Sequence, residues 1–376
     1  MVGASVARAV RGLSVALVAG SRPVTVSQAP SAQFDTRVYA ISPGNVEFLR
    51  SIKVWDAIPP ERLSPIRAMR VFGDAPGASI EFDAYRAGVS ELAWIVEDRA
   101  LQSALWAALG TQDGLHLIVP SRCISLELGD KAKVTLSDGR LIEADLLVGA
   151  DGADSFVRNA AGIAAEEKAY GQTAIVANFA CERAHDCTAY QWFQGGPVLA
   201  LLPLPGKRVS MVWSVAAEHA AHLMALDAAA LAEEVSAASQ GLLGSLETES
   251  APHAYPLRRM TASRMVLAHL ALAGDAAHAI HPLAGQGLNL GLQDARTLGT
   301  LLAEREPIRK AGDLRLLRRY ERERSEAILA MRAAVDGLHS LFGHQDSGLR
   351  RLRNFGLNLT DRLPVIKNIL LRHALN

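Results

Sequence analysis

The chain has 376 residues, more than the roughly 100 to 200 of a usual single domain, so we expect two domains built on a large core. Hydrophobic residues make up 49% and charged residues 21% of the sequence, a balance that is typical of folded proteins and excludes wholesale disorder. The formal net charge at pH 7 is zero, so no overall field draws the protein to nucleic acid, and we expect no nucleic-acid partner.

The amino-terminal segment permits two interpretations. Its first 34 residues contain no Asp or Glu but include Arg8, Arg11 and Arg22, as a mitochondrial targeting peptide does. Alternatively, residues 2–11 form a helix and residues 13–18 form a strand, in the order found in the first half of a dinucleotide-binding unit. We favour the second interpretation.

A hairpin and a strand–turn–helix unit are predicted in the middle of the chain. Asp138 and Gly139 separate two short runs of alternating residues, which predicts a β-hairpin over residues 133–143. The apolar run 146–149 then leads through a glycine-bearing turn into a helix over residues 155–161. A strand that ends in such a turn before a helix is a typical place for a ligand.

Four segments rich in Val, Leu, Trp and Phe predict an antiparallel sheet that carries the substrate. They are residues 174–180, 190–193, 198–202 and 209–215. Aromatic side chains in this sheet either line a pocket for an aromatic ring or fill the core, and the sequence favours neither interpretation. The aromatic candidates are Tyr190, Trp192, Phe193 and Trp213.

The remaining chain is predicted to contain one more buried strand, over residues 267–273, followed by a Gly-Asp turn and mostly helices. One helix is expected over residues 287–304 and a charged surface helix over residues 314–331. Glycines at 285, 287 and 291 allow backbone to come close to another group near the start of the first helix.

The most specific segment begins Gly274-Asp275-Ala276-Ala277-His278 and continues with Pro282-Leu283-Ala284-Gly285-Gln286-Gly287-Leu288-Asn289. It resembles the second FAD fingerprint of the class A flavoprotein monooxygenases, and its sequence from Pro282 onward is most similar to that of the ubiquinone-biosynthesis hydroxylases. In such a site a carboxylate such as Asp275 accepts a ribityl hydroxyl, while N–H groups at the helix start face the pyrophosphate and the flavin edge.

A metal site is the alternative interpretation of the same segment. Asp275, His278 and His281 are spaced so that their side chains can converge on one ion. The glycines and the proline that follow add nothing to a site of rigid side-chain ligands, so we expect no metal.

Three further segments carry the resemblance, the third only in part. Residues 148–158 resemble the family's DG motif, which lies near FAD and the approach of the nicotinamide donor. Residues 35–42 resemble its arginine segment, with Arg37 available to the FAD pyrophosphate or the flavin edge; a surface salt bridge is the alternative. Of the family's GxGxxG turn only the last glycine is present, as Gly3, and Ala19-Gly20 stand where the family tends to place an acid.

The resemblance implies a set of cofactor-binding residues and no assignable catalytic base. The implied residues are Gly3, Arg37, Asp151, Gly152, Gly274, Asp275, Pro282, Gly285, Gly287, Leu288 and Asn289. It also implies that a strand ending in two more glycines would precede Met1, so that FAD occupancy depends on restoring it.

The implied fold is α/β, with a Rossmann-like FAD-binding domain interleaved with an antiparallel-sheet substrate domain and a helical carboxyl-terminal region. Along the chain, the FAD-binding domain is expected in residues 1–75, 96–165 and 263–310. The substrate domain is expected in residues 76–95 and 166–262, and the helical tail in residues 311–376.

The implied function is an FAD-dependent monooxygenase that hydroxylates a polyprenylated phenol in ubiquinone biosynthesis, with dioxygen and a transiently bound NAD(P)H donor. The alternatives are a flavin hydroxylase for a soluble aromatic compound and a non-catalytic scaffold with the same fold. The resemblance also makes a ubiquinone-biosynthesis complex a candidate partner.

The tail suggests a location. Residues 349–376 contain six basic residues and a single acid, Asp361, and their apolar residues recur at helical spacing. A basic amphipathic helix of this kind lies on anionic membrane surfaces, or docks on its own core or a partner. We therefore expect a cytoplasmic protein peripheral to the inner membrane, or a mitochondrial matrix protein in a eukaryote. No apolar run approaches the ~20 residues that a membrane span needs.

Overall fold

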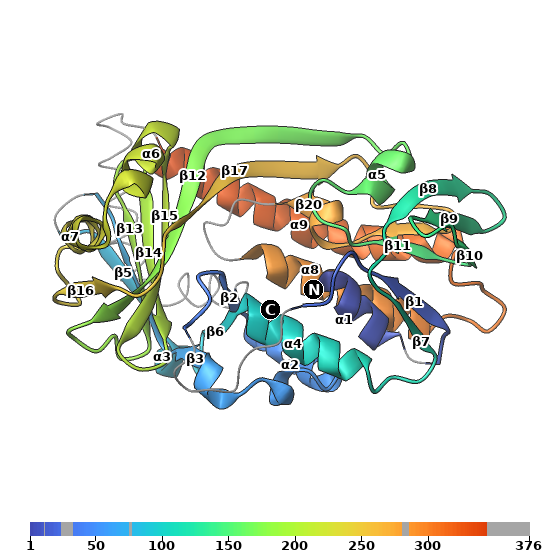
Figure 1. Cartoon of the computed structure of the whole chain (residues 1–376), viewed down its shortest axis with the longest axis horizontal. Helices are drawn as coiled ribbons and strands as arrows, with labels where there is room; N and C mark the ends of the chain where they lie inside the picture. Colours follow the sequence, from blue (N-terminus) through green and yellow to red (C-terminus); the bar gives the residue numbers. More distant parts are fainter. Residues whose placement is uncertain (11, 24–32, 75–76, 280–285, 344–376) are drawn as a thin grey trace.

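A large sheet forms one end of the molecule, and short strands from three smaller sheets lie toward the other end (Figure 1). The structure is a computed structural model that describes residues 1–10, 12–23, 33–74, 77–279 and 286–343. Its helices are α1 (Val2–Ala9), α2 (Pro43–Ser51), α3 (Ala84–Ala87), α4 (Asp98–Leu109), α5 (Phe156–Ala160), α6 (Ala217–Ala225), α7 (Ala228–Ala238), α8 (Gln286–Ala303) and α9 (Leu314–Gly343). Short 3-10 turns occur at η1 (Trp55–Ala57), η2 (Pro60–Arg62) and η3 (Gly274–Ala276).

Parallel strand pairs flanked by helices confirm the α/β class. Strand β1 (Val15–Val18) pairs in parallel with β7 (Leu115–Ile118). Strand β11 (Leu147–Gly149) pairs in parallel with β19 (Leu270–Leu272), and these two pairs belong to separate sheets. The prediction of a single strand over residues 267–273 is wrong. It is two strands, β18 (Val266–Leu267) and β19, which pair antiparallel around a turn where His269 has a positive φ of 63°.

The large sheet has nine strands and contains all four segments predicted for it. In spatial order they are β20 (His278–Ala279), β17 (His253–Ala262), β12 (Ala165–Cys181), β15 (Arg208–Ala216), β14 (Val198–Leu204), β13 (Thr188–Phe193), β4 (Ala68–Phe72) and β5 (Ser79–Asp83), with β16 (Leu246–Thr248) also paired to β12. All pairings are antiparallel except that of β13 with β4.

The two faces of this sheet have different neighbours. Its outer face packs against α6 and α7, where Leu223 and Val235 are fully buried. Helix α7 begins at Asp227, whose side chain accepts a hydrogen bond from the N–H of Ala230 at 2.8 Å, as a capping residue does. On the inner face Leu204 packs with Ile95 of the other half of the molecule. This part of the sheet is therefore buried on both sides.

Two smaller antiparallel sheets complete the fold. Strands β2 (Val38–Ile41), β6 (Ala93–Glu97) and β3 (Leu63–Ile66) form one, and β8 (Cys123–Leu128), β9 (Ala132–Leu136) and β10 (Leu141–Ala144) form the other. The pairing of β9 with β10 confirms the predicted hairpin. Strand β4, which lies within residues 1–75, belongs to the large sheet, and β6, which begins within residues 76–95, pairs with β2.

Helices α1 and α8 pack closely because glycines face alanine and valine. A Cβ added at Gly291 would lie 2.6 Å from Val2, and one added at Gly299 would lie 2.6 Å from the Cβ of Ala9. The element that comes close to the backbone at Gly291 is therefore helix α1. A Cβ at Gly287 would meet nothing within 4 Å.

Gly299→Ala should lower the free energy of unfolding by about 1–3 kcal/mol, because Ala9 has no rotatable side chain to move aside and the helices must separate. The measurement is urea denaturation of the protein without added cofactor.

Gly287→Ala is the matched control on the same helix. Its new methyl group enters open space, so we expect no change or a gain of about 0.5–1 kcal/mol from helix propensity. Equal stability of the two variants would contradict the packing described for α1 and α8.

Candidate functional site

The two glycine-bearing turns singled out in the sequence meet because the strands before them are neighbours. Strands β11 and β19 run parallel, so their carboxyl ends lie at one edge of the sheet. The N–H of Ala273 donates to the carbonyl of Gly149 at 2.9 Å, and the buried guanidinium of Arg158 donates to the carbonyl of Ala276 at 3.1 Å. Arg158 thus joins the two turns directly, instead of reaching out to a phosphate.

The carboxylate of Asp151 caps helix α5. It accepts hydrogen bonds from the hydroxyl of Ser155 and from the N–H of Val157, the latter at 3.1 Å. The adjacent Gly152 has a φ of 89°, and a Cβ there would meet nothing within 4 Å. In this turn the Asp151 side chain stabilises the start of helix α5. The unobstructed backbone of Gly152 is the part that can approach a ligand.

The second turn points its two residues in opposite directions. Gly274 has a φ of 59° and its N–H donates to the buried carboxylate of Asp294 at 2.8 Å. Asp275 is exposed, yet burial by surrounding protein raises the pKa of its carboxyl, against the lowering effects of His278, Arg37 and the chain's own amino group. Asp275 is therefore open to solvent on one side and surrounded by protein on the others.

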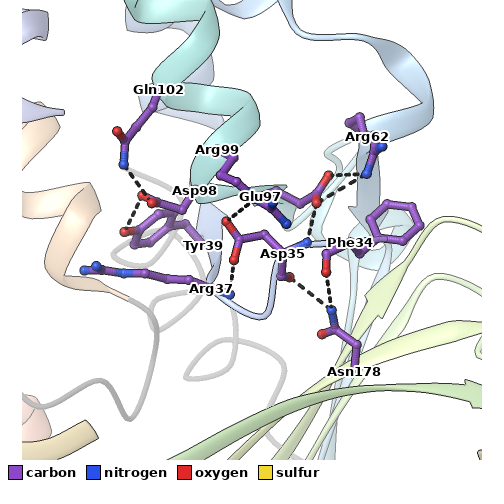
Figure 2. A network of polar contacts seen from close by, with 10 residues as sticks. All are labelled: Phe34, Asp35, Arg37, Tyr39, Arg62, Glu97, Asp98, Arg99, Gln102 and Asn178. Carbon is purple, nitrogen blue, oxygen red and sulfur yellow. Dashed lines mark hydrogen bonds and ion pairs between the residues drawn. The ribbon is translucent and has the colours of Figure 1, made fainter. Parts of the chain in front are cut away.

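Segment 34–37 is held between the two halves of the molecule, as Figure 2 shows. The side-chain amide of Asn178, on the large sheet, donates to the carbonyls of Phe34 and Asp35 at 3.1 Å each. From the other side the buried carboxylate of Glu97 accepts the N–H of Asp35 at 2.6 Å and pairs with Arg62 at 3.2 Å. The backbone that carries Arg37 is therefore fixed at the junction of the two layers.

Arg37 itself extends from this segment over the ring of Tyr39, 5.7 Å from its centroid (Figure 2). Burial alone would lower the pKa of Arg37, but Tyr39, Asp98, Tyr255 and Asp275 together raise it. Among the described residues its guanidinium forms no ion pair, whereas Asp35 pairs with Arg99 at 3.1 Å. The salt bridge in this segment is therefore formed by Asp35 with Arg99, and not by Arg37.

Tyr39 and Asp98 form the wall behind Arg37. The Tyr39 hydroxyl donates to Asp98 at 3.0 Å, and the Gln102 side chain donates to the second Asp98 oxygen at 2.7 Å (Figure 2). Burial raises the pKa of Tyr39 far above its ordinary value. These groups, with Glu97, Asn178 and Asp294, are the site residues that the sequence did not single out.

The start of helix α8 is anchored by Asn289. Its side-chain oxygen accepts the N–H of Ser42 at 3.0 Å and the amide of Asn45 at 2.9 Å, and its own amide donates to Ala40 at 2.7 Å. Leu288 is buried in the core beside it. Asn289 thus places the helix start against β2 and α2.

The other predicted cofactor residues are distributed as follows. Gly3, on α1, lies beside the DG turn, since a Cβ there would stand 3.3 Å from the Cβ of Ala150. Pro282 and Gly285 lie outside the described residues, as does His281 of the metal alternative. Within the described part of the chain, no group of three or more His, Cys, Asp and Glu residues is arranged to hold a metal ion.

All four aromatic candidates are buried in apolar clusters of the large sheet, three of them in one cluster. Tyr190, Trp192 and Trp213 are buried with the residues of α6 and α7 on the outer face of the large sheet, and Trp192 stacks on Phe72 at 5.2 Å. Phe193 is buried in a separate apolar cluster with Val71, Ile80 and Val198. The structure supports the core interpretation for Tyr190, Trp192 and Trp213.

The groups around Asp275 fit a dinucleotide with phosphates and polyhydroxyl chains. A guanidinium without an ionic partner among the described residues and a helix start with an open glycine suit anionic oxygen, and an exposed carboxylate suits hydroxyl donors. The chain's amino group lies in the same neighbourhood: burial lowers its pKa, and Asp98, Arg37 and Asp275 all act on it.

Comparison with known proteins agrees with this geometry. The FAD binding domain family matches residues 9–335. The 3-demethoxyubiquinol 3-hydroxylase of Escherichia coli is 34% identical over 379 residues, covering 100% of this chain and 96% of that protein. Ubiquinone hydroxylase UbiL of Rhodospirillum rubrum is 34% identical over 374 residues, covering 98% of this chain and 85% of that protein.

Solved structures share the fold. HpxO of Klebsiella pneumoniae, in complex with FAD and uric acid, superposes with a TM-score of 0.75 at 20% identity and covers 99% of this chain and 95% of that one. The family match over most of the chain and the full-length relatives show the same cofactor and the same enzyme class. The chain belongs to the family of FAD-dependent hydroxylases of ubiquinone biosynthesis.

Proposed function

We propose that this enzyme hydroxylates the ring of a polyprenylated phenol in ubiquinone biosynthesis, using dioxygen and a transiently bound NAD(P)H donor. The observation that carries the proposal is the meeting of the Asp275 turn, the Gly152 turn and Arg37 beside the large sheet, in a chain related over its full length to hydroxylases named for ubiquinone substrates.

For the cofactor, we assign each residue a task that its position supports. The Asp275 carboxylate accepts a ribityl hydroxyl, and the N–H groups at the start of α8, beside Gly287, face oxygen atoms of the cofactor. Arg37 supplies positive charge to the pyrophosphate or the flavin edge. Gly152 leaves room for the backbone to approach the cofactor, and Gly3 allows α1 to pack closely beside the DG turn. The bound flavin supplies hydride acceptance and the activation of dioxygen.

For the substrate ring, the inner face of the large sheet near Tyr255 is the surface that the geometry favours. Tyr255 on β17 lies opposite Ala174 on β12, which in turn lies opposite Ser214 on β15. Ala174 and Ser214 are small and buried, and Tyr255 beside them is 43% exposed and acts electrostatically on Arg37. A ring held there lies between the sheet and the cofactor-binding half, where the two layers keep bulk water away from the reaction.

For location, we propose a peripheral association with an anionic membrane through the tail, in a cytoplasmic protein or in the mitochondrial matrix of a eukaryote. Residues 349–376 lie outside the described part of the chain, so the support is their basic amphipathic sequence. No helix of the described part is long and apolar enough to cross a membrane. A ubiquinone-biosynthesis complex is the partner that this location favours.

Asp275→Ala should weaken FAD binding by about 10- to 150-fold, because a hydrogen bond to a charged acceptor contributes roughly 1.5–3 kcal/mol. The measurement is the dissociation constant for FAD from flavin fluorescence. Asp138→Ala, which removes an exposed carboxylate of the β9–β10 turn, is the control and should bind FAD as the parent does. Unchanged FAD affinity in Asp275→Ala would remove the ribityl assignment.

The reaction should incorporate one oxygen atom of labelled dioxygen into the ring of a short-chain prenylphenol, with NAD(P)H consumed faster when the phenol is present. Mass spectrometry of the product makes the measurement. Label from water would rule out flavin hydroxylation. Donor consumption that yields only hydrogen peroxide would mean a different aromatic substrate, and absence of both flavin and turnover would support the scaffold alternative.

Removal of residues 349–376 should release the protein from vesicles that contain anionic lipid and leave FAD affinity unchanged, because the expected contact is a basic helix outside the cofactor site. Vesicle sedimentation is the assay, with neutral phosphatidylcholine vesicles as the control. Unchanged sedimentation of the shortened protein would favour a tail docked on the protein core.

A further inference from the structure

A buried acid on α8 joins three separate elements behind the Asp275 turn. Asp294 is fully buried, and its carboxylate accepts the N–H of Gly274 at 2.8 Å. The same oxygen lies 2.6 Å from Nε2 of His278 on β20. The other oxygen accepts a hydrogen bond from Nε of Arg324 on α9 at 2.7 Å. All three partners are themselves buried.

This arrangement keeps a carboxylate charged where water is excluded. Burial alone raises the pKa of an acid, but at Asp294 the charges and hydrogen bonds of His278 and Arg324 outweigh burial, and its pKa is lowered. A buried ion pair contributes little net stability compared with apolar packing, while the loss of one partner leaves a costly unpaired charge. The network is therefore better suited to fixing one geometry than to stabilising the fold.

Arg324 is itself held in place. Its guanidinium also donates to the carbonyl of Leu290 at 3.3 Å and to the side chain of Gln293 at 3.1 Å, both on α8. One turn earlier on α9, the hydroxyl of Tyr320 donates to the carbonyl of Leu272 at 2.9 Å. Helix α9 thus braces both α8 and the strand that leads into the turn.

The geometry of the turn explains what the bracing achieves. Asp294 holds the N–H of Gly274 on the inner side, at a φ of 59° that favours glycine. The next residue, Asp275, is then presented to solvent. A shift of Gly274 would move the Asp275 carboxylate with it, since the two residues share one peptide plane.

We propose that Asp294 is a positioning residue for FAD, which fixes the Gly274–Asp275 turn so that the Asp275 carboxylate meets the cofactor, with Arg324 as its counter-ion. This inference rests on the part of the proposed function that assigns Asp275 to FAD. It is independent of the identity of the aromatic substrate.

The test is the dissociation constant for FAD of Asp294→Asn, which keeps the shape and removes the charge. We expect at least about tenfold weaker binding, as for loss of a charged hydrogen-bond acceptor. Ser239→Ala is the control, because it removes a buried neutral hydrogen bond, to the carbonyl of Ser236, at the end of α7 on the outer face of the large sheet. Its FAD affinity should stay within about threefold of the parent, given a neutral hydrogen bond far from the carboxylate. Equal losses in both variants, or no loss in Asp294→Asn, overturn the proposal.

A double variant separates positioning from general destabilisation. If Asp294 acts through Asp275, then Asp275→Ala combined with Asp294→Asn binds FAD no more weakly than Asp275→Ala alone. If the two substitutions together weaken FAD binding by the product of their separate effects, the proposal is contradicted. If Asp275→Ala alone binds FAD as tightly as the parent, the ribityl assignment itself is overturned. Should Asp294→Asn fail to fold, Arg324→Lys replaces it, because lysine keeps the charge but not the forked contacts. FAD affinity must then fall more than in Ser239→Ala, and equal affinities overturn the proposal.

Discussion

The parallel pairing of β11 with β19 is the constraint on which the candidate site depends. These strands lie more than a hundred residues apart in the chain, and each ends in a glycine-bearing turn. Their pairing puts both turns at one edge, where Arg158 bonds from one to the other. Helix α8 is joined to this edge by Asp294, which accepts the N–H of Gly274, while Asn289 fixes the start of the helix against β2 and α2.

The second layer of organisation is the attachment of Arg37 to both halves of the molecule. Asn178 belongs to the large sheet and Glu97 to the other half, and each bonds the segment that carries Arg37 (Figure 2). A displacement of the sheet relative to the turns would therefore move Arg37 as well. In the proposed enzyme this links the surface that faces the substrate ring to the charge that faces the cofactor.

The sequence predicted the strand–turn–helix units because their apolar runs, glycines and following helices are contiguous in the chain. It did not reveal Asp294 and Arg324, since an acid inside an apolar helix and a base inside a charged one have no spacing signal that pairs them. The aromatic residues of β13 were undecided for a related reason. All six residues of that strand are buried, so alternation cannot say which face meets α6 and α7. The break at His269 was missed because the residues around it are uniformly apolar.

The most direct test of the central claim is an experimental structure of the protein with FAD bound. The account predicts that the Asp275 carboxylate contacts a ribityl hydroxyl, that the start of α8 and Arg37 face the cofactor, and that the flavin ring lies toward the inner face of the large sheet near Tyr255. Density for FAD at another place, or an Asp275 carboxylate without contact to it, would contradict the account.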